Sequence, residues 1–134
     1  MSTASKQQAS LPKLVITAGE PAGIGPELCY WLGSQNFEAE ITVLADIHAL
    51  QTAGNNSQLT TAQIQLSEGY ATTTQRPGKL SVLHHPLAEP VIAGQLNSHN
   101  AQQVLSLLDT AMQGCESGRF DAMVTAPLQK SVIN

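Results

Sequence analysis

The residues best suited to chemistry lie in TAGEPAGIGPELCYWL, residues 17–32, which follows the apolar run KLVI. Three glycines and two prolines fall within eight positions of this loop. A strand that passes through a glycine-rich turn into a helix presents backbone N–H groups and the positive end of a helix dipole, both of which attract phosphates and carboxylates. The loop therefore predicts a ligand site; the alternative is that glycine and proline only build a tight turn.

The loop departs from the two common glycine motifs. G-x-G-x-x-G would begin at Gly23, but Leu28 stands where the third glycine belongs. No Gly-Lys-Ser/Thr triplet follows, and Glu27 occupies the neighbourhood where a P-loop carries its lysine. We expect instead that Gly23 and Gly25 let the chain reverse tightly, that Pro26 begins a helix and that exposed N–H groups face a cleft.

Ionisable side chains elsewhere offer fewer candidates. Asp46 follows the loop at the spacing of a ribose-binding carboxylate, but a role as the N-cap of a helix explains it as well and is favoured. His84 and His85 are adjacent, so in a strand they point to opposite faces. His48 and His99 have no ligand residue three or four positions later. We predict that none of the four histidines binds a metal.

The elements that position these residues follow from the pattern of apolar runs. Short apolar runs alternate with segments of helical period, which predicts an α/β fold with a mostly parallel sheet covered by helices. We expect strands at 13–18, 40–45, 79–85 and 119–126, a weak edge strand around Ile64 and Leu66, and helices at 26–33 and 46–53.

The clearest helix is expected from Ser98, a plausible N-cap, to Gly114 or Gly118. Pro127 is expected to open a further helix. The apolar face of the helix from Ser98 is predicted from residues at helical spacing, namely Val104, Leu105, Leu108, Ala111, Met112 and Cys115.

Length and composition favour one compact domain of a soluble, cytoplasmic protein. The chain has 134 residues, 42% of them apolar and only 12% charged, and a net charge of -4 with six scattered Lys and Arg, which argues against nucleic-acid binding. We expect neither a secretory signal nor a membrane-spanning helix, because the first ten residues are small and polar and no apolar run approaches eighteen residues. We expect a disordered polar tail over 1–12 and one α/β lobe over 13–134. Cys29 and Cys115 are expected to be reduced thiols, although counting leaves a disulfide open.

Four segments together resemble the amino-terminal part of one enzyme family. ITAGEPAGIGPEL, VLAD, AGQLNSHNA and FDAMVTAPLQKSVIN are similar, in that order and spacing, to 4-hydroxythreonine-4-phosphate dehydrogenase of vitamin B6 biosynthesis. The resemblance runs from about residue 13 to the last residue. It implies a truncated part of a three-layer fold similar to isocitrate and isopropylmalate dehydrogenases, which agrees with the incomplete Rossmann motif.

The resemblance also implies the chemistry. Family members oxidise 4-phosphohydroxy-L-threonine with NAD and decarboxylate the product to 3-amino-2-oxopropyl phosphate, using a divalent metal such as Zn, Mg or Co, and they act as homodimers. The family's metal-binding histidines, and the His-Thr pair and basic residues that hold its substrate, correspond to positions beyond the last residue of this chain. We therefore expect the chain alone to be inactive.

Site residues can be transferred only onto matching loops. The resemblance implies that the glycine loop lines the cofactor cleft and that Thr125 and Lys130 contact substrate. Thr125 ends a strand at the sheet edge where ligands bind, and Lys130 could offer an ammonium to an anion or be only a solvated helix lysine. The expected cofactor-binding residues are Gly19, Glu20, Pro21, Gly23 and Gly25.

The sequence is also compatible with two other functions. A related dehydrogenase of four-carbon phosphorylated sugar acids, threonate or erythronate 4-phosphate, shares these motifs. A non-catalytic module that binds a phosphate or nucleotide through the glycine loop is the alternative from another class. As a structural fragment, the chain would end after its last strand with an apolar face uncovered, which predicts marginal stability or aggregation.

Overall fold

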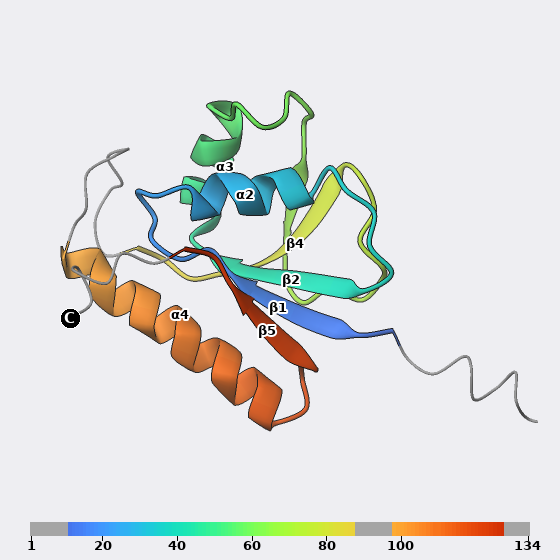
Figure 1. Ribbon diagram of the computed structural model, residues 1–134, viewed down its shortest axis with the longest axis vertical. Helices are drawn as coiled ribbons and strands as arrows, with labels where there is room; N and C mark the ends of the chain where they lie inside the picture. Colours follow the sequence, from blue (N-terminus) through green and yellow to red (C-terminus); the bar gives the residue numbers. More distant parts are fainter. Residues whose placement is uncertain (1–10, 88–97, 128–134) are drawn as a thin grey trace, which may run out of the picture.

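The computed structural model describes residues 11–87 and 98–127, which form one parallel sheet between two layers of helices (Figure 1). Within these residues the sheet has five strands in the order β3-β4-β2-β1-β5, and each pairing is parallel. The predicted α/β class is therefore confirmed. In chain order the elements are β1 (Lys13–Thr17), α2 (Gly25–Leu32), β2 (Glu40–Ala45), α3 (Ile47–Asn55), β3 (Gln65–Glu68), β4 (Lys79–His84), α4 (Ser98–Glu116) and β5 (Ala122–Thr125).

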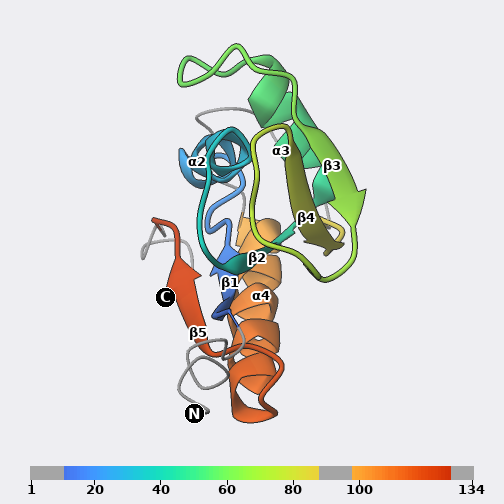
Figure 2. The ribbon, with the colours of Figure 1, turned by 90° about the vertical axis from the view of Figure 1, so that its right-hand side faces the viewer.

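Helices α2 and α3 cover one face of the sheet, and α4 covers the other (Figures 1 and 2). The alternation of side chains along β1 shows the division, because Ile16 packs toward Tyr30 of α2 while its neighbour Val15 packs toward Leu107 of α4. Continuous burial along β2 fits a parallel strand that is covered on both faces.

Local signals place the helix starts where the sequence predicts them. Pro26 lies in the first turn of α2, where its missing N–H needs no partner. Asp46 caps α3 with its side chain, as favoured from the sequence. The phenol of Tyr30 accepts a hydrogen bond from the backbone N–H of Ile64 (3.0 Å), and the ring packs directly on Gly54, so α2 holds both α3 and the approach to edge strand β3.

The predicted apolar face of α4 is partly wrong. Leu105 and Met112 are exposed, at 40% and 53%, whereas Leu107, which the predicted set left out, is buried. Apolar residues occur in adjacent pairs along this helix, so its sequence is compatible with two stripes, and only contact with the sheet selects one. The buried stripe consists of Ala101, Val104, Leu107 and Ala111, with Cys115 packed beside it.

The last strand is shorter than predicted and leaves one face open. It covers only Ala122–Thr125 of the expected range 119–126 because residues 117–120 form the turn after α4. Val124 is 49% exposed, and among the described residues β5 pairs with β1 alone. The uncovered apolar surface expected at the last strand is therefore present at Val124 of β5.

Some expectations lie outside the described residues. These are the tail, apart from Leu11 and Pro12, the helix after Pro127, and Lys130. The carbonyl of Pro12 already accepts a hydrogen bond from the Glu40 N–H (2.8 Å). Among the described helices, none combines the length and apolarity needed to cross a membrane.

The two cysteines are free thiols in the structure. Cys29 belongs to α2 and packs in the core on one face of the sheet. Cys115 belongs to α4 and packs against the core on the other face. The sheet lies between them, so the disulfide that cysteine counting left open is not formed.

Candidate ligand-binding site

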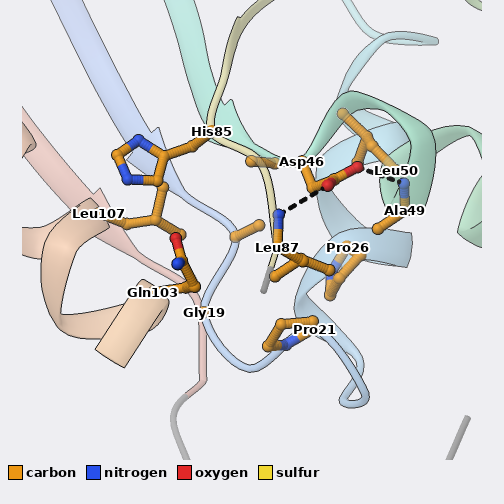
Figure 3. A pocket seen from close by; sticks show the side chains of 12 residues that line it. Gly19, Pro21, Pro26, Asp46, Ala49, Leu50, His85, Leu87, Gln103 and Leu107 are labelled. Carbon is orange, nitrogen blue, oxygen red and sulfur yellow. Dashed lines mark hydrogen bonds between the residues drawn. The ribbon is translucent and has the colours of Figure 1, made fainter. Parts of the chain in front are cut away.

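A pocket opens at the carboxyl edge of the sheet, where β1, β2 and β4 end (Figure 3). It is a partly open hollow of about 320 Å³, a volume that includes open solvent. The chain leaves β2 for α3 on one face and leaves β4 for α4 on the other face, so these neighbouring strands form a topological switch point, the usual ligand site of open α/β sheets. The lining residues come from three strand ends, from the first turns of α2 and α3, and from α4.

The sequence predicts that Gly23 and Gly25 shape the glycine loop. In the structure the two constrained positions are Gly19 and Gly25. Gly19 has a φ of +75°, and a Cβ there would lie 2.5 Å from the carbonyl oxygen of Pro127. A Cβ on Gly25 would overlap the carbonyl of Ala18. Gly23 has only ordinary contacts around its α-carbon, so a side chain there is sterically tolerated.

Several backbone N–H groups of the glycine loop donate hydrogen bonds within the protein. The N–H of Glu20 donates to the carbonyl of Pro127 (3.4 Å), and that of Gly23 donates to the carbonyl of Glu20 (3.0 Å). The N–H of Ala22 donates to the Glu20 carboxylate (3.4 Å), which is itself buried. The expectation that exposed loop N–H groups face the cleft is therefore wrong for these three donors, because the turn uses them to hold its own shape.

Asp46 joins the ends of β2 and β4 at the pocket wall. Its Oδ1 accepts from the N–H groups of His48 (2.9 Å) and Ala49 (3.0 Å), while its Oδ2 accepts from the N–H of Leu87 (2.9 Å; Figure 3). Burial by itself raises the pKa of Asp46, but these backbone donors outweigh that effect and hold the pKa below its ordinary value. The carboxylate is therefore negatively charged at neutral pH.

The histidines on β4 and after it point to opposite faces, as predicted. Nδ1 of His84 accepts the N–H of Ile47 (3.0 Å), whereas Nε2 of His85 lies 3.0 Å from the Ser106 hydroxyl on α4. The rings of His84 and His48 meet edge to face with centroids 5.5 Å apart, a contact that the sequence did not indicate. Among the described residues, no group of three or more His, Cys, Asp or Glu is arranged to hold a metal.

The predicted site residues separate into three groups. Gly19 and Pro21 line the pocket, whereas Glu20, Gly23 and Gly25 belong to the same loop without lining it. Thr125 ends β5 beside Thr17 of β1, with an exposed side chain outside the pocket. Lys130 lies outside the described residues.

Sequence reasoning missed the contributions of β4 and α4 to the pocket. His85 and Leu87 follow β4, and Gln103 and Leu107 lie one turn apart on α4. The four-residue spacing of Gln103 and Leu107 was a usable signal, because it places both side chains on one helix face. Which strand end this face meets depends on the topology and is not encoded locally.

Glu27 has a structural role away from the pocket. Its carboxylate accepts hydrogen bonds from the N–H of Gln58, the hydroxyl of Ser57 (2.9 Å) and the N–H of Leu59 (3.2 Å). These donors, that of Gln58 first, hold the pKa of Glu27 below its ordinary value. Glu27 thus fastens α2 to the segment after α3, which explains why an acidic residue occupies this place in the loop motif.

A parallel sheet between helices, with a largely apolar pocket at its switch point, makes this an α/β domain of the class that holds its ligands at the carboxyl edge of the sheet. The family model described as "Pyridoxal phosphate biosynthetic protein PdxA" matches residues 37–134. The chain belongs to this family.

Individual relatives agree with this assignment. The chain is 49% identical over 127 residues to 4-hydroxythreonine-4-phosphate dehydrogenase from Azoarcus sp. (strain BH72), covering 93% of this chain and 37% of that protein. It is 42% identical over 125 residues to the enzyme of that name from Vibrio cholerae, covering 93% and 38%. The chain thus spans little more than a third of the length of these relatives.

The fold comparison agrees as well. A solved structure from Salmonella typhimurium, assigned to the same dehydrogenase, superposes with a TM-score of 0.78 at 26% identity, over 91% of this chain and 39% of that one. The parallel sheet flanked by helices is therefore the architecture of part of these proteins.

Proposed function

We propose that the chain is the amino-terminal lobe of an NAD-dependent and divalent-metal-dependent dehydrogenase. The whole enzyme would oxidise 4-phosphohydroxy-L-threonine and decarboxylate the product to 3-amino-2-oxopropyl phosphate, in the synthesis of pyridoxal 5′-phosphate. The observation that carries the proposal is the 49% identity to a dehydrogenase of this name over 93% of the chain. Membership in the PdxA family supports the same pathway.

The proposal extends to the architecture and assembly of the whole protein. The proposal includes a three-layer fold similar to that of isocitrate and isopropylmalate dehydrogenases, a homodimeric state and a cytoplasmic location. The two helical layers around the parallel sheet support the first of these. The open edge of β5 supports the idea that more structure packs against this lobe.

The pocket fits part of an NAD molecule better than a metal ion. Gly19 and Pro21 of the predicted cofactor loop line it, and its walls are mostly apolar. NAD, when bound, supplies the acceptor for the hydride that leaves the substrate. The role of this chain would be to orient the cofactor and to exclude water around it.

The described residues do not fit the divalent metal. The carboxylate of Asp46 is occupied by three N–H groups, and Nδ1 of His84 accepts a fourth. His85 is engaged with Ser106, and no cluster of three ligands exists within residues 11–87 and 98–127. This observation, taken with the family resemblance, supports our proposal that the metal ligands lie in the part of the enzyme that this chain does not include.

An NADH-forming assay tests the proposal. The 134-residue chain should be silent with 4-phosphohydroxy-L-threonine, NAD and divalent metal, whereas a chain extended past Asn134 to the length of the relatives should turn over. Robust metal-dependent turnover by the 134-residue chain alone would refute the placement of the metal site.

Threonate and erythronate 4-phosphate, used as substrates in the same assay, distinguish this enzyme from the related sugar-acid dehydrogenases. Micromolar binding of simple phosphates without turnover by the extended chain would favour the non-catalytic module.

A further inference from the structure

A backbone donor fixes the protonation state of His84. This half-buried histidine ends β4, and its Nδ1 lies 3.0 Å from the backbone nitrogen of Ile47, the first residue of α3. A backbone N–H can only donate, so Nδ1 must accept and the ring proton must be on Nε2. Protonation of Nδ1 turns this acceptor into a second donor and breaks the hydrogen bond. The bond between β4 and α3 therefore exists only while His84 is neutral.

Three ionisable side chains lie on the elements packed around His84 in the described part of the chain. His48 of α3 is exposed, and its ring meets that of His84 edge to face with centroids 5.5 Å apart. Asp46 caps the same helix, and Glu68 of β3 is exposed and pairs in register with Val82, two positions before His84. A protonated His84 is repelled by a charged His48 and by the positive end of α3, and it is attracted by the two carboxylates. Its charge therefore favours a ring position away from the N–H of Ile47.

Two hydrogen bonds tie the end of β4 and the residues after it to the start of α3, and they respond to acid separately. The second bond runs from the N–H of Leu87 to the carboxylate of Asp46 (2.9 Å; Figure 3). Burial raises the pKa of Asp46, but its backbone donors, that of Leu87 first, outweigh burial and hold the pKa below its ordinary value. Histidines change charge between about pH 5 and pH 8, where this carboxylate stays ionised. Of the two bonds, the one at His84 is the one that breaks in that range.

We propose that His84 is a pH-sensitive latch: protonation of its Nδ1 releases the first turn of α3 from β4, while Asp46 still caps the helix. Asp46 and Ala49 of this region line the pocket, so mild acid changes one wall of the pocket while the sheet stays folded. The inference is independent of the proposed function, because it concerns a hydrogen bond within this chain and needs no cofactor, metal or turnover.

Nuclear magnetic resonance of the 134-residue chain between about pH 8 and about pH 5 tests the latch. At the upper end, His84 should be the Nε2–H tautomer, and a coupling through the hydrogen bond should join its Nδ1 to the nitrogen of Ile47. The coupled population should fall about 10-fold for each pH unit below the midpoint of the ring titration. Protection of the Ile47 amide from hydrogen exchange, relative to an unstructured amide at the same pH, should fall with the same midpoint. The amides of His48 and Ala49, which are bonded to Asp46, should keep their protection.

Two variants separate the latch from other effects of acid. His84→Asn places an amide oxygen near the position of Nδ1, so it keeps an acceptor that does not titrate. The protection of Ile47 should then stay constant over the whole range. His85→Asn is the matched control, because His85 faces α4 and pairs with Ser106, and it should leave the pH response of Ile47 as in the parent.

Four results would overturn the inference. They are an Nδ1–H tautomer of His84 at about pH 8, a coupling to Ile47 that survives the ring titration, a pH response of Ile47 that persists in His84→Asn, and a ring that titrates only as the whole chain unfolds. The tautomer and the coupling are read on the unmodified chain, so a folding defect of the variant leaves the test decisive. None of these results bears on dehydrogenase activity, which the NADH-forming assay tests separately.

Discussion

Among single residues, two glycines in the glycine loop differ in how closely the backbone packs against their α-carbons. Gly25 lies against the Ala18 carbonyl, so an added methyl group must displace backbone, whereas Gly23 is exposed and has room. We predict that Gly25→Ala lowers the free energy of unfolding by about 1–3 kcal/mol. Gly23→Ala should change it by less than about 0.5 kcal/mol. Urea unfolding measures both, and equal effects would contradict the packing seen here.

The two thiols should differ sharply in reactivity. Burial raises the pKa of Cys29 to about 12, so almost no thiolate exists at neutral pH. Cys115 is only partly buried at the end of α4. We predict that an alkylating reagent labels Cys115 in the native chain and spares Cys29 until the chain unfolds. Mass spectrometry of the digested protein reads this out, and early labelling of Cys29 would show that α2 is not packed as described.

At the scale of elements, the N-terminus of α3 is held from two strands. Asp46 caps it from β2, and His84 of β4 accepts the N–H of Ile47. Replacing Asp46 by Ala removes the cap and the link to Leu87 together. We predict a loss of about 1–2 kcal/mol of unfolding free energy, measured by urea denaturation. Asp109→Ala on the exposed side of α4 is a control for the loss of charge.

The same carboxylate should make stability depend on pH. Because the pKa of Asp46 is lower in the folded chain than its ordinary value, its ionisation stabilises the fold above the unfolded pKa, and this contribution is lost as pH falls through the folded pKa. We predict that Asp46→Asn, which keeps a capping side chain, is less stable than the parent at neutral pH. The difference should vanish well below about pH 4. A difference that persists at acidic pH would assign it to packing rather than charge.

How far sequence predicts this lobe depends on the range of the contacts involved. The starts of α2 and α3 were predictable because Pro26 and Asp46 act on their own first turns. The bond from Leu87 to Asp46 joins residues far apart in the chain and leaves no local pattern. The prediction of the buried face of α4 was wrong at Leu105 for the same reason. Contact with the sheet, and not the helix sequence, decides which of the two apolar stripes is buried.

For the whole molecule, the open edge of β5 is the feature that most favours self-association. Val124 is exposed, and the neighbouring strand edge has no partner within the described residues. We predict that the chain self-associates and that Val124→Lys reduces this, because a charge on an edge strand opposes further pairing. Sedimentation velocity over a range of concentrations measures it. Thr72→Lys, at an exposed position in the loop before β4, is the control for added charge.

We propose that the ligand site of this lobe is the pocket at the switch point between β2 and β4. Nuclear magnetic resonance mapping of amide shifts during titration of the 134-residue chain with NAD tests it most directly. Binding in this pocket should shift the amide signals of residues 18–20, 45–50, 85, 87 and 103–107, which surround it. Shifts confined to the outer faces of α2 and α3 or to the edge of β5, or no shifts at millimolar NAD, would contradict it.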